Sequence, residues 1–245
     1  MALLDNPLHW SLVYLILFSA TVVQGGVGFG FGLIAAPLLL LIEPSLLPGP
    51  LIVAALTLTV TMAVRGWRWI EFAIIPWLLL GFLPGLWLGT TLLQILSPQQ
   101  TAYLFGFLVL SAVAISAIGW QPELKPITLI PAALFSAILS VTTTMGGPPI
   151  ALAVQSLPGL RFRHTLAFFF TLAGLLTLSS LATIQRVGST EIHQGVWLMP
   201  PVLLGIWISG FVGRWLDKGK TRRAILTVAA LSGITVILRA WLTPP

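Results

Sequence analysis

The sequence predicts an all-α, polytopic membrane protein built from two inverted repeats, and three observations lead to this fold class. First, 57% of the 245 residues are hydrophobic and only 7% are charged, whereas a soluble domain carries about 25% charged residues. Second, the apolar residues fall into runs of helix length, without the alternation that is typical of membrane β-strands. Third, the two halves share short matching segments at an offset of 120 residues.

The first repeat is expected at residues 1–120. It opens with a long apolar segment, 10–42, which contains the glycine-rich stretch from Gln24 to Gly32. A helix needs about 20 residues to cross a bilayer, so this segment is too long for one straight span. Three ordinary spans are expected after it, near 46–64, 72–93 and 101–119.

The second repeat is expected at residues 121–245, after a turn in the proline-containing connection 121–126. Its long apolar segment, 127–157, is interrupted by the stretch from Thr142 to Pro149. Paired interruptions at matching places in two halves are typical of a transporter's binding site. Three further spans are expected near 165–184, 196–215 and 224–242.

The internal repeat rests on five matches at one ungapped offset, which are difficult to attribute to biased composition alone. The matches are Leu56-Thr57-Leu58 with Leu176-Thr177-Leu178, Glu71 with Glu191, Gly85-Leu86-Trp87 with Gly205-Ile206-Trp207, Thr101 with Thr221, and Gly26 with Gly146.

Charge counting favours a re-entrant hairpin over a single crossing for each interrupted segment. If each segment crosses once, the basic residues divide 5 against 7 between the two sides. If each segment forms a hairpin of two short helices, they divide 10 against 2, as the positive-inside rule requires. Each repeat then has three full crossings, an odd number, so the repeats are inverted and both termini face outside.

The interruptions are the predicted binding site for a small anion. Half-helices that begin inside the membrane present unpaired N–H groups, and the positive end of the helix dipole favours an anion. Glycines permit close approach of the backbone, while hydroxyl and amide groups can replace the water around an anion. The candidate residues are Gln24, Gly26, Gly28, Gly30, Thr57, Thr61, Thr142, Thr143, Thr144, Gly146, Gly147 and Thr177.

These residues also have structural interpretations. Gly26 and Gly30 are four residues apart, a spacing that brings membrane helices together. A membrane threonine commonly bonds back to its own helix. The basic cluster Arg161, Arg163 and His164 either attracts anions at the cytoplasmic mouth or anchors the topology.

The composition argues against other classes of protein. Cysteine is absent, which excludes disulfides and thiol chemistry. No charged residue lies clearly inside a predicted span, so we expect no catalytic residue, no metal site and no cofactor. The basic residues lie at the ends of spans, so nucleic acid is not an expected partner despite the net charge of +6. An intramembrane enzyme is therefore disfavoured, and a passive anion channel stays the alternative to a carrier.

The order of the motifs carries a family resemblance. A glycine-rich turn is followed by a proline at Pro37, then a threonine-rich span ends in the turn Arg65–Trp69, and the next span has small residues at Gly81, Gly85 and Gly89. This order and its duplication resemble the TauE/SafE sulfite exporter family over essentially the whole chain. The resemblance implies transport of small sulfur-containing or organic anions, such as sulfite, sulfonates or thiosulfate.

The expected partners are a small anionic substrate and the lipid of a cell membrane, of the bacterial inner-membrane type. A homodimer is compatible with the sequence, although no pattern in it requires one.

Overall fold

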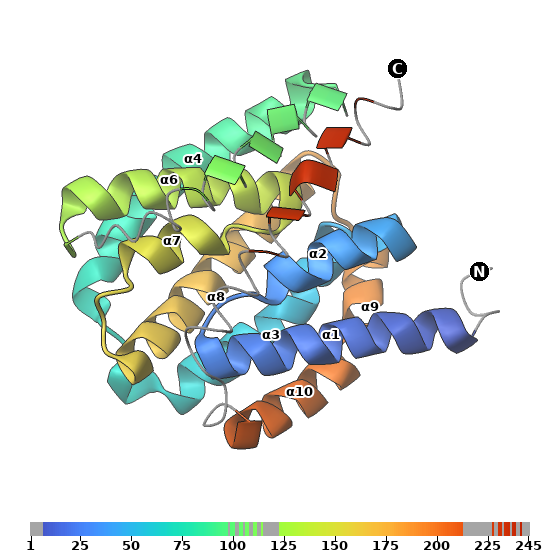
Figure 1. Cartoon of the computed structure of the whole chain (residues 1–245). Helices are drawn as coiled ribbons and strands as arrows, with labels where there is room; N and C mark the ends of the chain where they lie inside the picture. Colours follow the sequence, from blue (N-terminus) through green and yellow to red (C-terminus); the bar gives the residue numbers. More distant parts are fainter. Residues whose placement is uncertain are drawn as a thin grey trace.

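A computed structural model describes residues 7–97 and 123–212, together with scattered positions between 99 and 114 and between 227 and 241 (Figure 1). Every regular element in this described part is helical, which confirms the predicted all-α class. By length and apolar composition, three of the described helical segments can each cross a membrane, namely Pro7–Val27, Phe72–Ile95 and Gly159–Thr183.

The first long apolar segment is interrupted within its glycine-rich stretch. Helix α1 (Pro7–Val27) and helix α2 (Phe31–Ile42) are separated by Gly28 and Gly30, whose φ angles of 104° and 121° are accessible mainly to glycine. The chain reverses there, and α2 returns along α1 (Figure 1). However, α1 has 21 residues and can cross a bilayer alone. The expectation of two short helices is therefore wrong for this segment, because the helix continues undisturbed through its last glycines.

The second long apolar segment is interrupted in a different way. Helix α6 (Pro126–Thr143) ends at Thr144, which adopts a left-handed conformation with a φ angle of 63°. The short helix α7 (Gly147–Ala153) then runs back along α6. The Ser136 hydroxyl donates a hydrogen bond of 2.6 Å to the Gly146 carbonyl and so holds the turn against α6. The long arms α6 and α1 run in opposite directions (Figure 1).

The remaining elements of the first half overlap the predicted spans 46–64 and 72–93, whereas most of 101–119 lies outside the described residues. They are η2 (Pro44–Leu46), α3 (Gly49–Arg65), η3 (Trp67–Trp69), η4 (Phe72–Ile74) and α4 (Ile75–Ile95).

The second half continues with α8 (Gly159–Thr183), which begins several residues before the predicted span 165–184. The predicted span 196–215 is not one straight helix. Instead, α9 (Ser189–Trp197) and α10 (Met199–Val212) meet at an angle of 44°. Two prolines follow the bend and remove backbone donors there, which accounts for the break. Most of the span 224–242 lies outside the described residues.

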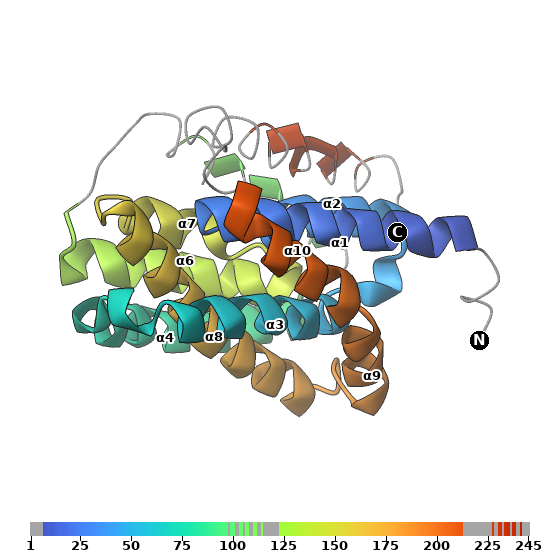
Figure 2. The same cartoon turned by 90° about the horizontal axis from the view of Figure 1, so that it is seen from below.

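Helices of the two halves pack in corresponding pairs. Helix α4 of the first half packs along α6 of the second, and α10 of the second half packs along α1 of the first (Figures 1 and 2). Helices α3 and α8 pack on each other between these pairs. A shift of about 120 residues along the sequence takes α1 to α6 and α4 to α10. The contact of α4 with α6 therefore corresponds to the contact of α10 with α1, and the same interface is formed twice.

Glycines permit close approach in both of the outer pairs. A Cβ atom on Gly85 would lie 2.4 Å from a carbonyl oxygen in α6, and one on Gly205 would lie 3.0 Å from a carbonyl oxygen in α1. Both positions therefore pack helices together. The neighbouring Trp87 and Trp207 point outward and are 69% and 65% exposed.

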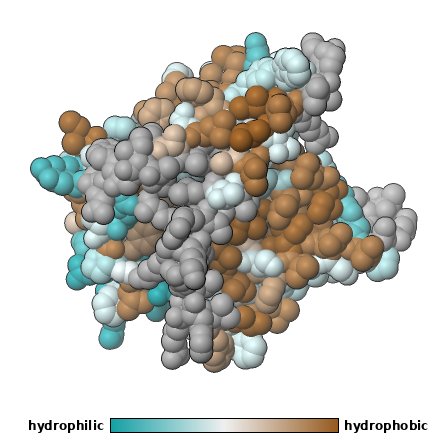
Figure 3. All heavy atoms as spheres, in the orientation of Figure 1, coloured by the Kyte–Doolittle hydropathy of each residue, from teal (hydrophilic) through white to brown (hydrophobic). Residues whose placement is uncertain are grey.

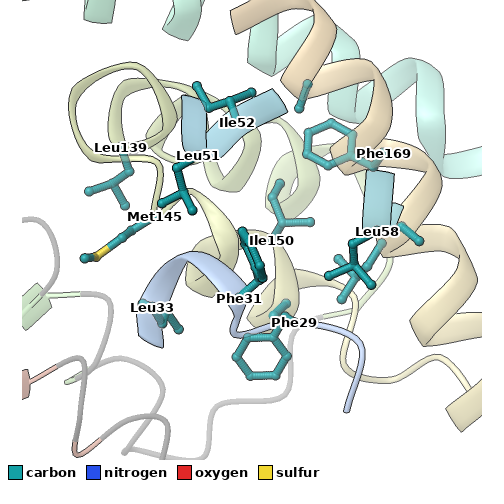
Figure 4. Close-up of a cluster of buried hydrophobic side chains, with 14 of the residues drawn as sticks. Phe29, Phe31, Leu33, Leu51, Ile52, Leu58, Leu139, Met145, Ile150 and Phe169 are labelled. Carbon is teal, nitrogen blue, oxygen red and sulfur yellow. The ribbon is translucent and has the colours of Figure 1, made fainter. Parts of the chain in front are cut away.

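The apolar side chains divide between a lipid-type surface and one core. Figure 3 shows a broad hydrophobic area over the side that carries α1 and α2, with hydrophilic residues mainly towards the edges. Inside, Figure 4 shows Phe31 of α2 and Ile150 of α7 in the same buried cluster as Ile52 of α3 and Phe169 of α8. The two interrupted segments and the central helices thus share one hydrophobic core.

Candidate functional site

A small cavity lies where the two interruptions meet beside α3 and α8. Its volume is about 90 Å³, several times what one water molecule needs but below the roughly 300–1,000 Å³ of sites for drug-sized ligands. A Cβ atom on Gly32 would lie 2.3 Å from the Thr144 carbonyl oxygen, so the interruptions touch there. The lining residues are Gln24, Gly30, Phe31, Gly32, Leu33, Ile52, Ala55, Leu56, Thr59, Ser140, Thr144, Met145, Gly146, Gly147, Phe170, Ala173, Gly174 and Thr177.

Most lining residues come in pairs, one from each half. The pairs from α3 and α8 differ by 118 positions and are Ile52 with Phe170, Ala55 with Ala173, Leu56 with Gly174, and Thr59 with Thr177. The pairs from the interruptions differ by 116 positions and are Gln24 with Ser140, Gly30 with Gly146, and Phe31 with Gly147. Corresponding parts of the two halves therefore surround one cavity.

Hydrogen-bond donors at the first interruption face this cavity. The buried Gln24 side chain accepts a hydrogen bond of 2.8 Å from the backbone N–H of Phe31 through its Oε1 atom. This bond satisfies an N–H group at the start of α2 and uses the carbonyl oxygen of the amide, so the NH₂ group of Gln24 is the part of this side chain that could donate to a ligand. The first turn of α2 lines the cavity, which brings the positive end of the helix dipole towards it.

The second interruption offers fewer backbone donors. Helix α7 begins at Gly147, but the next two residues, Pro148 and Pro149, have no N–H group. The polar groups on this side come instead from the turn and from Ser140, which lines the cavity. The two interruptions are thus equivalent in position and unequal in chemistry.

Thr177 is the most unusual polar residue of the cavity wall. It is 1% exposed, and its Oγ1 atom has no hydrogen-bond partner among the residues that the structure describes. A buried hydroxyl without a partner is unfavourable in a protein interior. A ligand with an acceptor atom in the cavity would remove this penalty.

The cavity carries no formal charge. None of its lining residues is acidic, basic or a histidine. Within the described part of the chain, no three His, Asp or Glu side chains lie close enough together to hold a metal ion. Attraction of an anion to this cavity would therefore depend on dipoles and N–H groups.

Comparison with known families decides the class of this protein. The family model described as Sulfite exporter TauE/SafE matches residues 13–236. The chain belongs to the TauE/SafE sulfite exporter family. This TauE/SafE protein is therefore a multi-pass membrane transporter for sulfur-containing anions and not an enzyme, and the family resemblance is confirmed. Searches of curated proteins and of solved structures found no match.

The cavity of the TauE/SafE protein contains half of the predicted site residues. Those that line it are Gln24, Gly30, Thr144, Gly146, Gly147 and Thr177. Those that do not are Gly26, Gly28, Thr57, Thr61 and Thr142. The side chain of Thr143 lies outside the described part of the structure.

The residues outside the cavity have other contacts. The Thr61 hydroxyl donates to the carbonyl of Thr57, and the Thr142 hydroxyl donates to a carbonyl four residues earlier. Gly26 accepts a hydrogen bond from Arg163 through its carbonyl oxygen, and Gly28 packs directly against Arg163. The threonine bonds match the structural interpretation of those residues, whereas the contacts of Gly26 and Gly28 with Arg163 were not predicted.

Sequence reasoning missed Thr59 and Ser140, both of which line the cavity. A pattern for Thr59 exists, because it continues the helical face formed by Ile52, Ala55 and Leu56. The four cavity-lining positions of α3 have counterparts in α8 that lie 118 residues later in the chain. The repeated sequence segments of the two halves, in contrast, align without gaps at an offset of 120 residues. The offset of 120 therefore pairs Thr177 with Thr57 in place of Thr59.

The basic cluster at the start of α8 is held by the first half of the TauE/SafE protein. Arg161 forms an ion pair of 3.0 Å with Glu71, and His164 contacts the Met62 carbonyl through Nδ1 at 2.8 Å. Arg163 donates to the Gly25 and Gly26 carbonyls. All three side chains connect α8 to the first half, which is a structural role.

Proposed function

We propose that this protein is a carrier of small sulfur-containing oxyanions, of the sulfite, sulfonate or thiosulfate type, and that the cavity is their binding site. The observation that carries the proposal is a small, uncharged cavity that contains several hydrogen-bond donors. Gln24 and the first turn of α2 supply them on one side, and the hydroxyl of Thr177 supplies another. Several donors around one centre suit an anion with several oxygen atoms.

The same chemistry disfavours cations. No carboxylate lines the cavity, so nothing there would neutralise a metal ion or an organic cation. Burying an unpaired cation at such a site is costly. The volume of about 90 Å³ also fits a small anion better than a large organic substrate.

We infer further that residues 1–120 and 121–245 are inverted repeats and that the carrier alternates access around the cavity. Three observations support this. The arms α1 and α6 run in opposite directions, the contact of α4 with α6 is repeated by the contact of α10 with α1, and corresponding positions line the cavity. In such transporters the two repeats move against each other around a fixed midplane site.

The proposed orientation has the basic end of the molecule in the cytoplasm, in a membrane of the bacterial inner-membrane type. The ion pair of Arg161 with Glu71 and the contact of His164 with Met62 bring the ends of α3 and α8 together. The hairpin arrangement predicts this proximity, whereas a single crossing of each interrupted segment predicts opposite sides. The positive-inside rule then places the adjacent ends of α3 and α8 on the cytoplasmic side.

Binding and exchange measurements test the proposal. Purified protein should bind sodium sulfite or sodium thiosulfate in anaerobic titration calorimetry, and choline or magnesium should give no heat. In proteoliposomes, uptake of labelled anion should saturate and accelerate when the same anion is inside. Ionic currents without exchange would instead identify a passive channel, and transport of cations alone would contradict the proposed site.

A further inference from the structure

We propose that Thr177 and Thr59 form a pair of hydroxyl donors that determines the specificity of the site for oxyanions. This inference rests on the proposed function and assigns two side chains to one task within it. Both threonines line the cavity from the two central helices, α8 and α3, which pack on each other. They occupy corresponding places, 118 positions apart, so a ligand between the halves meets one hydroxyl from each.

The first argument is the unpaired state of Thr177. Apart from Thr59, nine helical threonines in the described part of the chain donate to a carbonyl three or four residues earlier, which is the usual arrangement in apolar helices. They are Thr21, Thr61, Thr90, Thr91, Thr128, Thr142, Thr171, Thr183 and Thr235. Thr177 does not use this local acceptor, although it is 1% exposed. Its hydroxyl therefore lacks the partner that burial normally requires.

The second argument is the weak bond of Thr59. This residue is 3% exposed, and its hydroxyl donates to the Leu56 carbonyl at 3.4 Å. Hydroxyl hydrogen bonds are usually about 2.7–2.8 Å long, so this one is close to broken. A rotation of the hydroxyl hydrogen towards the cavity would cost little.

The third argument is the chemistry around the two hydroxyls. The remaining positions of the α3 and α8 walls are apolar or glycine, as with Ile52, Leu56 and Phe170. On these two helices an anion meets hydroxyl donors only at the threonines. Two oxygens of one sulfur centre can accept from the threonines while a third faces Gln24 and the start of α2. A halide has no such set of oxygens and gains less from the pair.

Isosteric substitution separates this role from a packing role. Thr177→Val exchanges the hydroxyl for a methyl group of similar shape. Because the hydroxyl is unpaired without ligand, the ligand-free variant should melt at the same temperature as the wild type or above it. Its affinity for sodium sulfite and sodium thiosulfate should fall about 10- to 100-fold, as for a lost hydrogen bond to a charged group. Thr177→Ser keeps the hydroxyl and should retain most of the affinity.

Matched variants complete the test. Thr59→Val should also weaken sulfite binding, with little change in melting temperature. Thr171→Val lies on the same helix but removes the bond to Ala167, so it should lower the melting temperature slightly and leave the affinity unchanged. Both cavity substitutions should weaken iodide binding much less than sulfite binding.

The outcomes are distinguishable. Wild-type protein that binds neither anion would overturn the proposed function and this inference together. Wild-type binding with unchanged affinity in Thr177→Val would overturn the inference alone. A clear drop in the melting temperature of ligand-free Thr177→Val would also overturn it, because the hydroxyl would then have a partner in the empty protein.

Discussion

The side chain of Arg163 fills the space beside the backbone of Gly28, so that a Cβ atom on Gly28 would lie 2.7 Å from Cγ of Arg163. The same arginine donates through Nη1 to the carbonyls of Gly25 and Gly26, at 3.3 and 3.0 Å. A cation from the second half thereby caps the C-terminal end of α1, where the helix dipole favours positive charge.

This contact predicts that Gly28 contributes to the stability of the fold. The φ angle of Gly28 is 104°, which is strained for a residue with a side chain such as alanine. In Gly28→Ala the new methyl group also collides with the side chain of Arg163. We expect destabilisation of at least about 1–3 kcal/mol, measured by denaturant unfolding in micelles. Gly210→Ala is the control, since nothing lies within 4 Å of its Cβ position. A Gly28→Ala protein of normal stability that fails to bind anions would instead support a direct binding role.

Removal of the arginine should have a comparable cost. Arg163→Ala leaves the carbonyls of Gly25 and Gly26 without their donor, and we expect a loss of about 1–3 kcal/mol in the free energy of unfolding. Arg163→Lys should recover part of it. Arg161→Ala breaks an exposed ion pair with Glu71 and should cost no more than about 1 kcal/mol. Equal effects of the two alanine variants would contradict the capping role.

The amide of Gln24 predicts a pH-dependent variant. Gln24→Glu keeps an acceptor for the Phe31 N–H but replaces the NH₂ donors with an oxygen. At a pH at which this carboxyl is ionised, the side chain repels anions, so sulfonate binding should be lost. At a lower pH, at which the carboxyl is neutral, binding should return.

The wild type is the reference for this experiment. No titratable side chain lines the cavity of the wild type, and a sulfonate keeps its charge over the same pH range. The affinity of the wild type for the sulfonate should therefore not change with pH. Calorimetric titrations over a series of pH values compare the two proteins. A Gln24→Glu variant that binds equally well at every pH would show that Gln24 does not face the ligand.

The absence of cysteine permits a direct test of topology. Single exposed cysteines at Arg68→Cys and Ser156→Cys should both be protected from an impermeant reagent added outside intact cells, while Ser189→Cys should be labelled. The hairpin arrangement puts residues 68 and 156 on one side. Labelling of Arg68→Cys with protection of Ser156→Cys would instead require a single crossing by the second interrupted segment.

The sequence reveals the interruptions because their cause is local. Glycines at 28 and 30 permit backbone angles that end α1, and prolines 148 and 149 suit the first turn of a new helix. Membrane insertion is equally local, since it follows from composition. Both features could therefore be predicted without knowledge of any tertiary contact.

The face that each central helix turns to the cavity is not local. Thr57 and Thr59 are both plausible on an isolated helix, and packing against α8 selects Thr59. The contact of Arg163 with the end of α1 joins residues more than 130 positions apart. No spacing rule within one segment predicts such a contact, so the capping role of the arginine emerges only from the folded chain.

The pairing of α1 with α10 has a consequence for synthesis on the ribosome. Helix α10 begins about 170 residues after α1 ends, which at about 5–20 residues per second is a delay of roughly ten to thirty seconds. During that interval α1 can sit in the bilayer, but the helix that covers one of its sides has not yet been made. Helices α4 and α6 are close in the sequence, so α6 is synthesised soon after α4 and the two can pack early. The nascent protein should therefore assemble from its middle outward. A chain truncated before Met199 would carry every cavity-lining residue and still lack the helix that fixes the first hairpin in position.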